Sequence, residues 1–210
     1  MEKTDLKQQF KALYRPPAQP VVVDVPSLNF LMIDGSGAPE QSERFQSAIG
    51  VLYGIAYTLK FMLKKAPVDG VGDFTVMPLE GLFGEAASGE HAAAFMHDDP
   101  AAWSWTLMIA LPDDITRELV AAATEELRRR KDPPCLADVR FERLSEGRCV
   151  QVMYLGAYDK EGPTIEQLHA FALEQGFALC GRHHEVYLGD PRRTAPERLK
   201  TVIRQPVTDG

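Results

Sequence analysis

Hydrophobic and polar positions follow two different periods along the chain. From Val21 to Ile33 the residues are mostly apolar and β-branched, with an interruption at Pro26, and the run stops at the turn-rich stretch "DGSGAP". This pattern predicts strands followed by a loop. Residues 41–65 place apolar side chains at alternating spacings of four and three, which predicts a long helix with a buried stripe. "FTVMPLEGLF" and "WSWTLMIALP" predict two more strands, and "PDDITRELVAAATEELRRRK" predicts a helix that ends in cations.

The second half of the chain repeats this order of elements. "VRFERL" and "RCVQVMYLG" alternate as strands do, "TIEQLHAFALEQGF" has a helical period, and "HHEVYLG" and "KTVIRQPV" predict two further strands. We therefore predict an α+β fold with two pseudo-symmetric β-α-β-β halves, about residues 21–134 and 135–210, built on antiparallel sheets. Helices would cover one sheet face, and the uncovered faces would enclose a central ligand cleft.

The first twenty residues precede this repeat. Thr4 is expected to cap a short amphipathic helix that carries Leu6, Phe10 and Leu13, and the prolines of "RPPAQP" end it. We predict an N-terminal helical arm and linker over residues 1–20, followed by a single domain over residues 21–210.

Composition and charge narrow the class of protein. The 210 residues are 45% hydrophobic and 25% charged, and the net charge of -7 weighs against a surface for nucleic acid. No segment has the unbroken apolar length that a bilayer requires, and the three cysteines are widely spaced, as is usual for reduced thiols. We expect a cytoplasmic monomer or homodimer that binds neither nucleic acid nor membrane.

The stretch "HHEVYLG" places a carboxylate in the middle of a predicted strand. Because side chains alternate along a strand, His183, Glu185 and Tyr187 would point to one face. Burying an unpaired charge costs several kcal/mol or forces the group to take up a proton. Glu185 is therefore either an edge-strand residue, in solvent or in an ion pair with Arg182 or Arg192, or it is part of a binding surface.

Aromatic residues are available to surround this carboxylate. An aromatic wall would raise the pKa of Glu185 and let it act as an acid or base near neutrality. An ionised Glu185 among aromatic faces would instead suit a flat cationic ligand. The spacing of Tyr53, Tyr57 and Phe61 is also typical of a buried helix stripe. The residues considered for the wall are Trp103, Trp105, Tyr53, Tyr57, Phe83, Tyr154 and Tyr187.

Several common signatures of nucleotide, serine-hydrolase and metal chemistry are absent from the sequence. There is no G-x-x-x-x-G-K-[ST], no G-x-S-x-G and no H-E-x-x-H. Adjacent histidines on a strand point to opposite faces, so only His183 could join Glu185 at one ion. We predict no metal ion and no cofactor.

Seven segments carry a family pattern: "FLMIDGSG", "YTLKFMLKK", "MPLEGL", "WSWTLMIALP", "VRFERLSEG", "EGPTIEQLH" and "HHEVYLGDPRRTAPERLKTVIRQPV". Together they resemble the stand-alone branch of the GyrI-like small-molecule-binding family, from about Met1 to Val207. Related domains include the effector-binding domains of multidrug-responsive activators and proteins named for inhibiting DNA gyrase. The resemblance implies two pseudo-symmetric halves around a central cleft that contains a glutamate, and Glu185 is the matching position.

The chain departs from the family pattern at two places. Phe83 and Gly84 follow "PLEGL" where tryptophans are common, and Tyr154 stands where a histidine is frequent. Both changes bear on the size of the cleft and on the choice of ligand.

The resemblance also implies that some members hydrolyse cyclopropanoid DNA-alkylating toxins by opening the strained ring with water. For that activity we expect Glu185 to act as general base, with the hydroxyl of Tyr53 or Tyr57 on the developing phenolate. His183 and Tyr187 would orient the carboxylate or bind ligand, as would Tyr154. Planar ligands would stack on Trp103, Trp105 and Phe83.

Other functions remain open at this level. The protein could bind and sequester hydrophobic planar or cationic small molecules without chemistry, with Glu185 as the counter-charge. It could also be an interaction protein like the gyrase inhibitors. A transcription regulator is disfavoured, because no residues remain outside the domain for a helix-turn-helix.

Overall fold

The computed structural model describes residues 3–39, 42–88 and 103–210, and of residues 85–88 only the backbone. Within these ranges eight strands form one antiparallel sheet in the order β1-β6-β8-β7-β3-β4-β2-β5. The strands are β1 Val21–Val25, β2 Leu28–Ser36, β3 Leu79–Ser88, β4 Ser104–Leu111, β5 Arg140–Leu144, β6 Gly147–Leu155, β7 Phe177–Tyr187 and β8 Lys200–Asp209. The helices are α1 Leu6–Gln9, α2 Lys11–Tyr14, α3 Glu43–Lys65, α4 Arg117–Arg130 and α5 Gly162–Glu174, with 3-10 turns at η3 Leu136–Asp138, η4 Tyr158–Lys160 and η5 Pro196–Arg198.

The strand order is pseudo-symmetric about the pairing of β3 with β7. β4 and β8 flank this central pair, and β2 and β6 follow on either side. The edges are exchanged, because β1 of the first half pairs with β6 and β5 of the second half pairs with β2. The predicted α+β class with two β-α-β-β halves is confirmed, and the halves share one continuous sheet.

Helix α3 covers the sheet on the face that carries Glu185. Phe45 of α3 contacts Trp105 of β4 edge-on, with the ring centroids 5.0 Å apart. Trp105 is paired with Phe83 of β3, which is paired with His183 of β7. Side chains of directly paired residues share a face, and His183 and Glu185 are two residues apart on one strand. All of them therefore point toward the side of α3.

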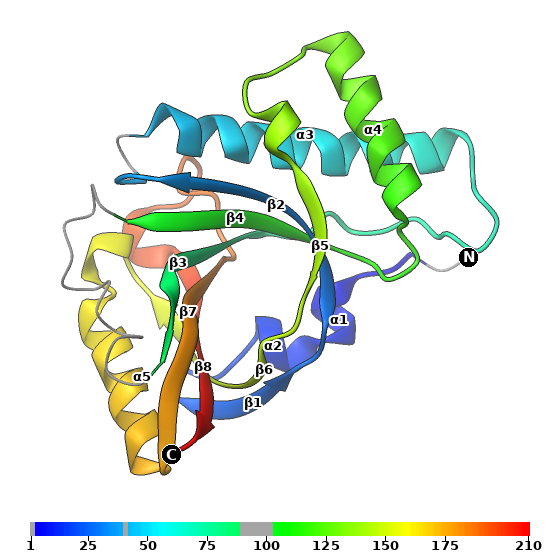
Figure 1. Ribbon diagram of the computed structural model, residues 1–210. Coiled ribbons are helices and arrows are strands. Elements are labelled where there is room, and N and C mark those ends of the chain that lie inside the picture. The colour runs from blue at the N-terminus through cyan, green and yellow to red at the C-terminus, as the bar shows by residue number, and fades with distance from the viewer. Residues whose placement is uncertain (1–2, 40–41, 89–102) are drawn as a thin grey trace.

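Helix α5 covers the same face in the second half. Leu168 of α5 packs in a cluster with Ile203 of β8, which is paired with Glu185. Glu185, paired with Gly81 of β3 and Ile203 of β8, thus lies on the central strands, between the parts of the sheet that α3 and α5 cover. Figure 1 shows α3 and α5 over different parts of the sheet. The expectation that uncovered sheet faces would enclose the cleft is wrong. The helices border the site because both pack on the apolar side of the sheet.

The N-terminal arm covers the opposite face. Leu6, Leu13 and Tyr14 are buried there, and Figure 1 shows α1 and α2 within the bend of the sheet, away from α3 and α5. The expected single helix is two short ones, and Asp5 rather than Thr4 caps the first, accepting from the Lys7 amide at 2.9 Å.

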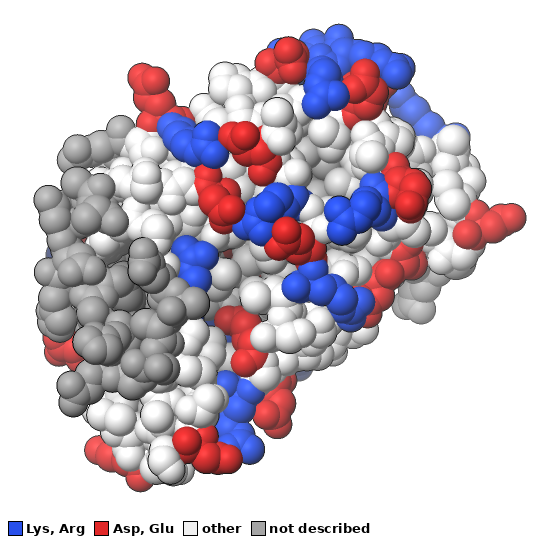
Figure 2. Space-filling model, viewed as in Figure 1, with Lys and Arg blue, Asp and Glu red and all other residues white. Residues whose placement is uncertain are grey.

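Helix α4 packs outside α3, where Leu127 contacts Gly54. A Cβ at Gly54 would lie 2.9 Å from Leu127 Cδ2, so the glycine allows the two helices to approach closely. None of the described helices is long and apolar enough to cross a membrane. Figure 2 shows acidic and basic side chains intermixed over the face in view.

Candidate functional site

Glu185 occupies an interior strand of the sheet. It is paired with Gly81 of β3 on one side and with Ile203 of β8 on the other, and its side chain is 13% exposed. The alternative of a solvated edge-strand glutamate is therefore wrong. Neither arginine pairs with it: Arg182 donates to the carbonyls of β3 residues, and Arg192 pairs with Asp190.

Hydrogen-bond donors from its own strand, β7, and from the start of α5 hold the Glu185 carboxylate. His183 Nε2 lies 3.0 Å from Oε1, and the Tyr187 hydroxyl and the Glu161 carboxyl group also hydrogen-bond to it. Burial by itself raises the pKa of Glu185, but these hydrogen bonds and the nearby His183 lower it below the ordinary value. The expectation that aromatic burial would raise this pKa is wrong, and Glu185 is ionised at neutral pH.

Glu161 is the residue of this site that sequence reasoning missed. It stands at the N-terminal end of α5, is 3% exposed, and accepts a hydrogen bond from the Thr201 hydroxyl at 2.9 Å. Burial, followed by the negative charge of Glu185, raises the pKa of Glu161 to about 9. Two carboxyl groups in contact do not both ionise near neutrality, so Glu161 keeps a proton that it donates toward Glu185.

Two tyrosines lie on one side of the Glu161–Glu185 pair. The rings of Tyr158 and Tyr187 meet edge-on with centroids 5.4 Å apart. Burial and then the two glutamates raise the pKa of Tyr158 to about 12, and burial and Glu185 raise the pKa of Tyr187 well above its usual value. Both hydroxyls stay protonated at neutral pH and serve as hydrogen-bond donors. Tyr158 was not predicted from the sequence.

Phe83 and Trp103 form the other side of the site around Glu185. A Cβ at Gly81, opposite Glu185, would lie 2.9 Å from Phe83 Cε2 and 3.5 Å from the Tyr187 hydroxyl. Phe83 and Tyr187 therefore approach each other over the glycine. Trp103 packs edge-on against Phe83 with centroids 6.1 Å apart. The structure thus brings Phe83, His183 and Tyr187 together around Glu185, and their contact with a ligand stays a prediction.

A family model for the GyrI-like small molecule binding domain matches residues 18–208 of the chain. The chain belongs to the GyrI-like family. A comparison with curated protein sequences finds no significant match.

Solved structures agree with the GyrI-like assignment. A protein described as a hydrolase from Listeria innocua is 37% identical, with a TM-score of 0.85 over 98% of this chain and 100% of that one. An uncharacterized conserved protein from Listeria innocua is 39% identical, with a TM-score of 0.86 and the same coverage. The EcmrR C-terminal domain is 12% identical, covers 91% of this chain and 98% of its own, and has a TM-score of 0.54. That last similarity shows the fold alone.

The two tyrosines expected to assist Glu185 in this GyrI-like domain lie on α3. The Tyr53 hydroxyl accepts a hydrogen bond from the Leu79 amide at 3.0 Å, and Leu79 is paired with Tyr187. Tyr57 stacks on Tyr53 with centroids 6.2 Å apart and is 47% exposed. Among the hydrogen bonds of the described residues, none joins either hydroxyl to Glu185. The structure places Tyr53 at the border of the site and Tyr57 further out.

The other two predicted ligand contacts of the GyrI-like domain lie apart from the carboxylate. Trp105 is 1% exposed, and its indole N–H donates to the Gly37 carbonyl at 3.2 Å, so its ring belongs to the core beneath α3. The Tyr154 hydroxyl donates to the Ala157 carbonyl at 2.9 Å. Tyr154 is paired with Thr201, which places it on the Glu161 side.

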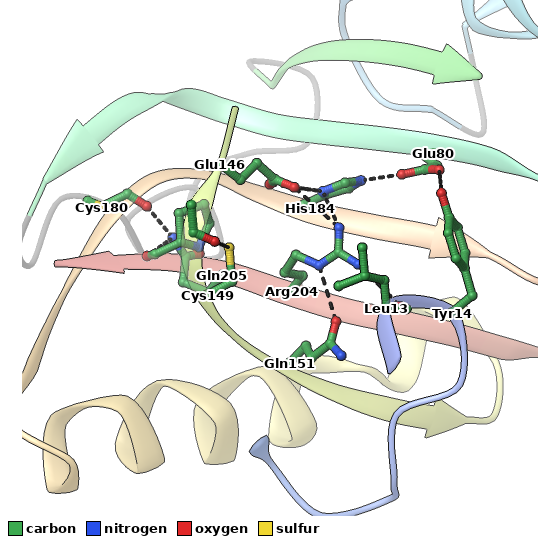
Figure 3. Close-up of polar contacts among 12 residues, drawn as sticks. Leu13, Tyr14, Glu80, Glu146, Cys149, Gln151, Cys180, His184, Arg204 and Gln205 are labelled. Carbon is green, nitrogen blue, oxygen red and sulfur yellow. Dashed lines mark hydrogen bonds and ion pairs between the residues drawn. The ribbon is translucent and has the colours of Figure 1, made fainter. Parts of the chain in front are cut away.

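A second polar cluster lies on the opposite face of the sheet, and we call it the arm network (Figure 3). His184 stands between Glu80 and Glu146 at 3.0 and 2.9 Å, and Arg204 pairs with Glu146 at 3.2 Å. Tyr14 of the arm donates to Glu80 at 3.0 Å. Because each charge has a partner and the cluster is closed to solvent, its role is to fix the N-terminal arm to the sheet. Gln151 and the carbonyl of Leu13 complete the network.

Metal ligands were sought among the described residues around Glu185 and in the rest of the described chain. No group of three or more His, Cys, Asp or Glu side chains is placed to share an ion within the ranges that the structure describes. His183 and His184 point to opposite faces and serve different clusters. The chemistry available at Glu185 is therefore that of an ionised carboxylate, a protonated carboxyl group behind it, and phenol and imidazole donors.

Proposed function

We propose that this GyrI-like protein binds hydrophobic planar small molecules at Glu185 and hydrolyses cyclopropanoid alkylating compounds there. The observation that carries the proposal is an ionised carboxylate in a mostly closed aromatic site, held by His183, Tyr187 and Glu161. The Listeria innocua relatives described as hydrolases support it. A carboxylate that is held in position and ionised can hydrogen-bond a water molecule and orient it toward an electrophile.

The reaction adds one water molecule to the ligand. A cyclopropane conjugated to a dienone is electrophilic because ring opening restores aromaticity. The water oxygen bonds to the ring methylene, the carbon–carbon bond of the cyclopropane breaks, and its electron pair reaches the carbonyl oxygen as a phenolate. Glu185 accepts the water proton, and the phenolate takes up a proton to give the phenol. Tyr53 is the better placed of the two α3 tyrosines to hydrogen-bond this oxygen, as oxyanion donors do.

The residues that line Glu185 divide these tasks. His183 and Tyr187 fix the carboxylate, and Tyr158 supports Tyr187 through the edge-on ring contact. Phe83 and Trp103 provide flat surfaces for a planar ligand. The lowered pKa of Glu185 keeps it ionised but makes it a weak base, so orientation of the water is its larger contribution.

The test is the mass of a spirocyclopropane dienone after incubation with the protein. Wild type should add the mass of one water, and Glu185→Gln should lower the rate by about 100-fold or more while binding persists. Glu174→Gln, at an exposed position of α5, is the matched control and should retain full turnover. Undiminished turnover by Glu185→Gln would rule out this role for the carboxylate.

A second candidate is sequestration of a hydrophobic cation without chemistry. The ionised state of Glu185 beside aromatic rings favours it, because charge and cation–π attraction then act together. A protein that only sequesters its ligand lowers the concentration of free ligand in proportion to the amount of protein added. The mass of the ligand stays unchanged. The same mass measurement separates the two functions.

A further inference from the structure

Two glutamates meet on the ligand face, and they differ in access to solvent. The Glu185 side chain is 13% exposed, whereas Glu161 as a whole residue is 3% exposed. Glu161 hydrogen-bonds to Glu185 and accepts a hydrogen bond from the Thr201 hydroxyl at 2.9 Å. We propose that Glu161 is a positioning residue whose proton is displaced by a cationic ligand at Glu185, so that binding releases one proton. The inference rests on the proposed ligand site.

The charges around the pair give the reason. From β7, His183 and Tyr187 face Glu185, and Tyr158 of η4 lies near both glutamates. Asp190, in the loop after β7, acts on Tyr158, and His169 of α5 lies near His183. Among the described residues no lysine or arginine forms an ion pair with either carboxyl group, and His183 supplies at most one positive charge. The second carboxyl group must therefore hold a proton or face a cation from outside.

The arm network on the other face provides an internal comparison. It also contains two glutamates, Glu80 and Glu146, but His184 and Arg204 stand between them as built-in cations. The same sheet thus neutralises one pair of carboxylates with its own side chains. On the face that carries Glu185, the described residues offer Glu161 no cation, and an exchangeable proton neutralises it.

Linkage fixes the sign of the effect. A cation within about 4–6 Å of a carboxyl group lowers its pKa by about 1–3 units, which favours loss of the Glu161 proton in the complex. As pH rises toward the pKa of about 9 in the unliganded protein, less free energy is needed to remove that proton. Between the lowered pKa in the complex and about 9, the dissociation constant of a cation should therefore fall by up to about tenfold per pH unit. It should level off below and above this range.

The experiment compares N-methylacridinium, a permanent planar cation, with acridine, a neutral ligand of the same shape at pH 8. Calorimetric titration in two buffers of different ionisation enthalpy counts the protons released. Wild type should release about one proton with the cation and none with acridine. Glu161→Gln, which keeps hydrogen bonds to Thr201 and Glu185 but has no acidic proton, should bind the cation without release.

A second variant keeps the test independent of how well Glu161→Gln folds. Thr201→Val removes the hydrogen bond that lowers the pKa of Glu161, so the rise in cation affinity should move to higher pH. Cation binding without proton release in wild type, or proton release that persists in Glu161→Gln, overturns the inference. The proposed ligand site at Glu185 is not contradicted by either result. Failure of both acridines to bind overturns the inference and the cation function together, while hydrolysis is judged by the mass of its product.

Discussion

At the scale of single residues, the absence of a side chain at Gly81 shapes the site as much as the charge of Glu185. The two residues are paired across β3 and β7, and Phe83 and Tyr187 close over the glycine. A methyl group at this position would lie 2.9 Å from Phe83 Cε2, so the ring would have to shift.

We expect Gly81→Ala to fold and to weaken binding of N-methylacridinium about tenfold, because the displaced Phe83 ring would narrow the approach to Glu185. Fluorescence titration measures the change. Gly50→Ala on α3 is the control, since a Cβ there meets no atom within 4 Å. Equal affinities for the two variants would show that ligands do not approach along Phe83.

The sequence predicted part of this site and missed the rest for a physical reason. Strand alternation was enough to place His183, Glu185 and Tyr187 on one face, because that period is local. Glu161 and Tyr158 reach the site through the packing of η4 and α5 on β7, which no local pattern reports. Their roles therefore became visible only in three dimensions.

At the scale of elements, helix starts were the weakest predictions. The helix predicted from "TIEQLHAFALEQGF", which starts at Thr164, begins two residues earlier: α5 starts at Gly162, and Pro163 lies in its first turn. Proline in the first turn of a helix is the signal that would have put Glu161 at the helix end. The strands and the long helices were predicted well, because their hydrophobic periods extend over many residues.

The arm network joins α2 to four strands, β3, β6, β7 and β8, and its charges should make stability depend on pH. Despite burial, His184 and then Arg204 lower the pKa of Glu146 to about 2, while Glu146 and Glu80 raise the pKa of His184 above its ordinary value. The Glu146 contribution is present above its unfolded pKa near 4.5 and is lost as pH falls toward 2. The His184 contribution is present below its unfolded pKa near 6.5 and is lost as pH rises through the raised value.

Urea unfolding across this pH range should therefore show an acidic loss of stability that Glu146→Gln removes. At pH 6 that variant should lose about 3–5 kcal/mol, because it leaves Arg204 and His184 buried without their shared carboxylate. Tyr14→Phe, which removes only the bond to Glu80, should cost about 1 kcal/mol. Equal losses of unfolding free energy in the two variants would contradict this account of the network. So would a loss of stability at acidic pH that persists in Glu146→Gln.

At the scale of the whole molecule, the exchanged edge strands connect the two halves. β1 completes the sheet of the second half, and β5 completes that of the first. The order of elements indicated two halves, but the pairing of strands was not predictable, because it depends on contacts between residues far apart in the chain. The face covered by the helices was mispredicted for the same reason.

We expect residues 1–134 and 135–210, made as separate fragments, to remain unfolded alone. Each fragment would expose the unpaired side of β3 or β7 and would lack the partner of an outer strand. Mixing the fragments should restore the circular dichroism spectrum of the full chain. A fragment that folds cooperatively by itself would show that the halves are independent domains.

The central claim is that an ionised Glu185 and a protonated Glu161 face the ligand as a pair. Carbon-13 NMR of the glutamate side-chain carboxyl groups, titrated with pH and assigned with Glu185→Gln and Glu161→Gln, measures both states directly. The account predicts one carboxyl that titrates below the ordinary value and one that titrates at about 9, and both should shift when a planar ligand is added. Two carboxyl groups that both titrate with the ordinary pKa of a glutamate, or resonances that do not shift when the ligand is added, would contradict it.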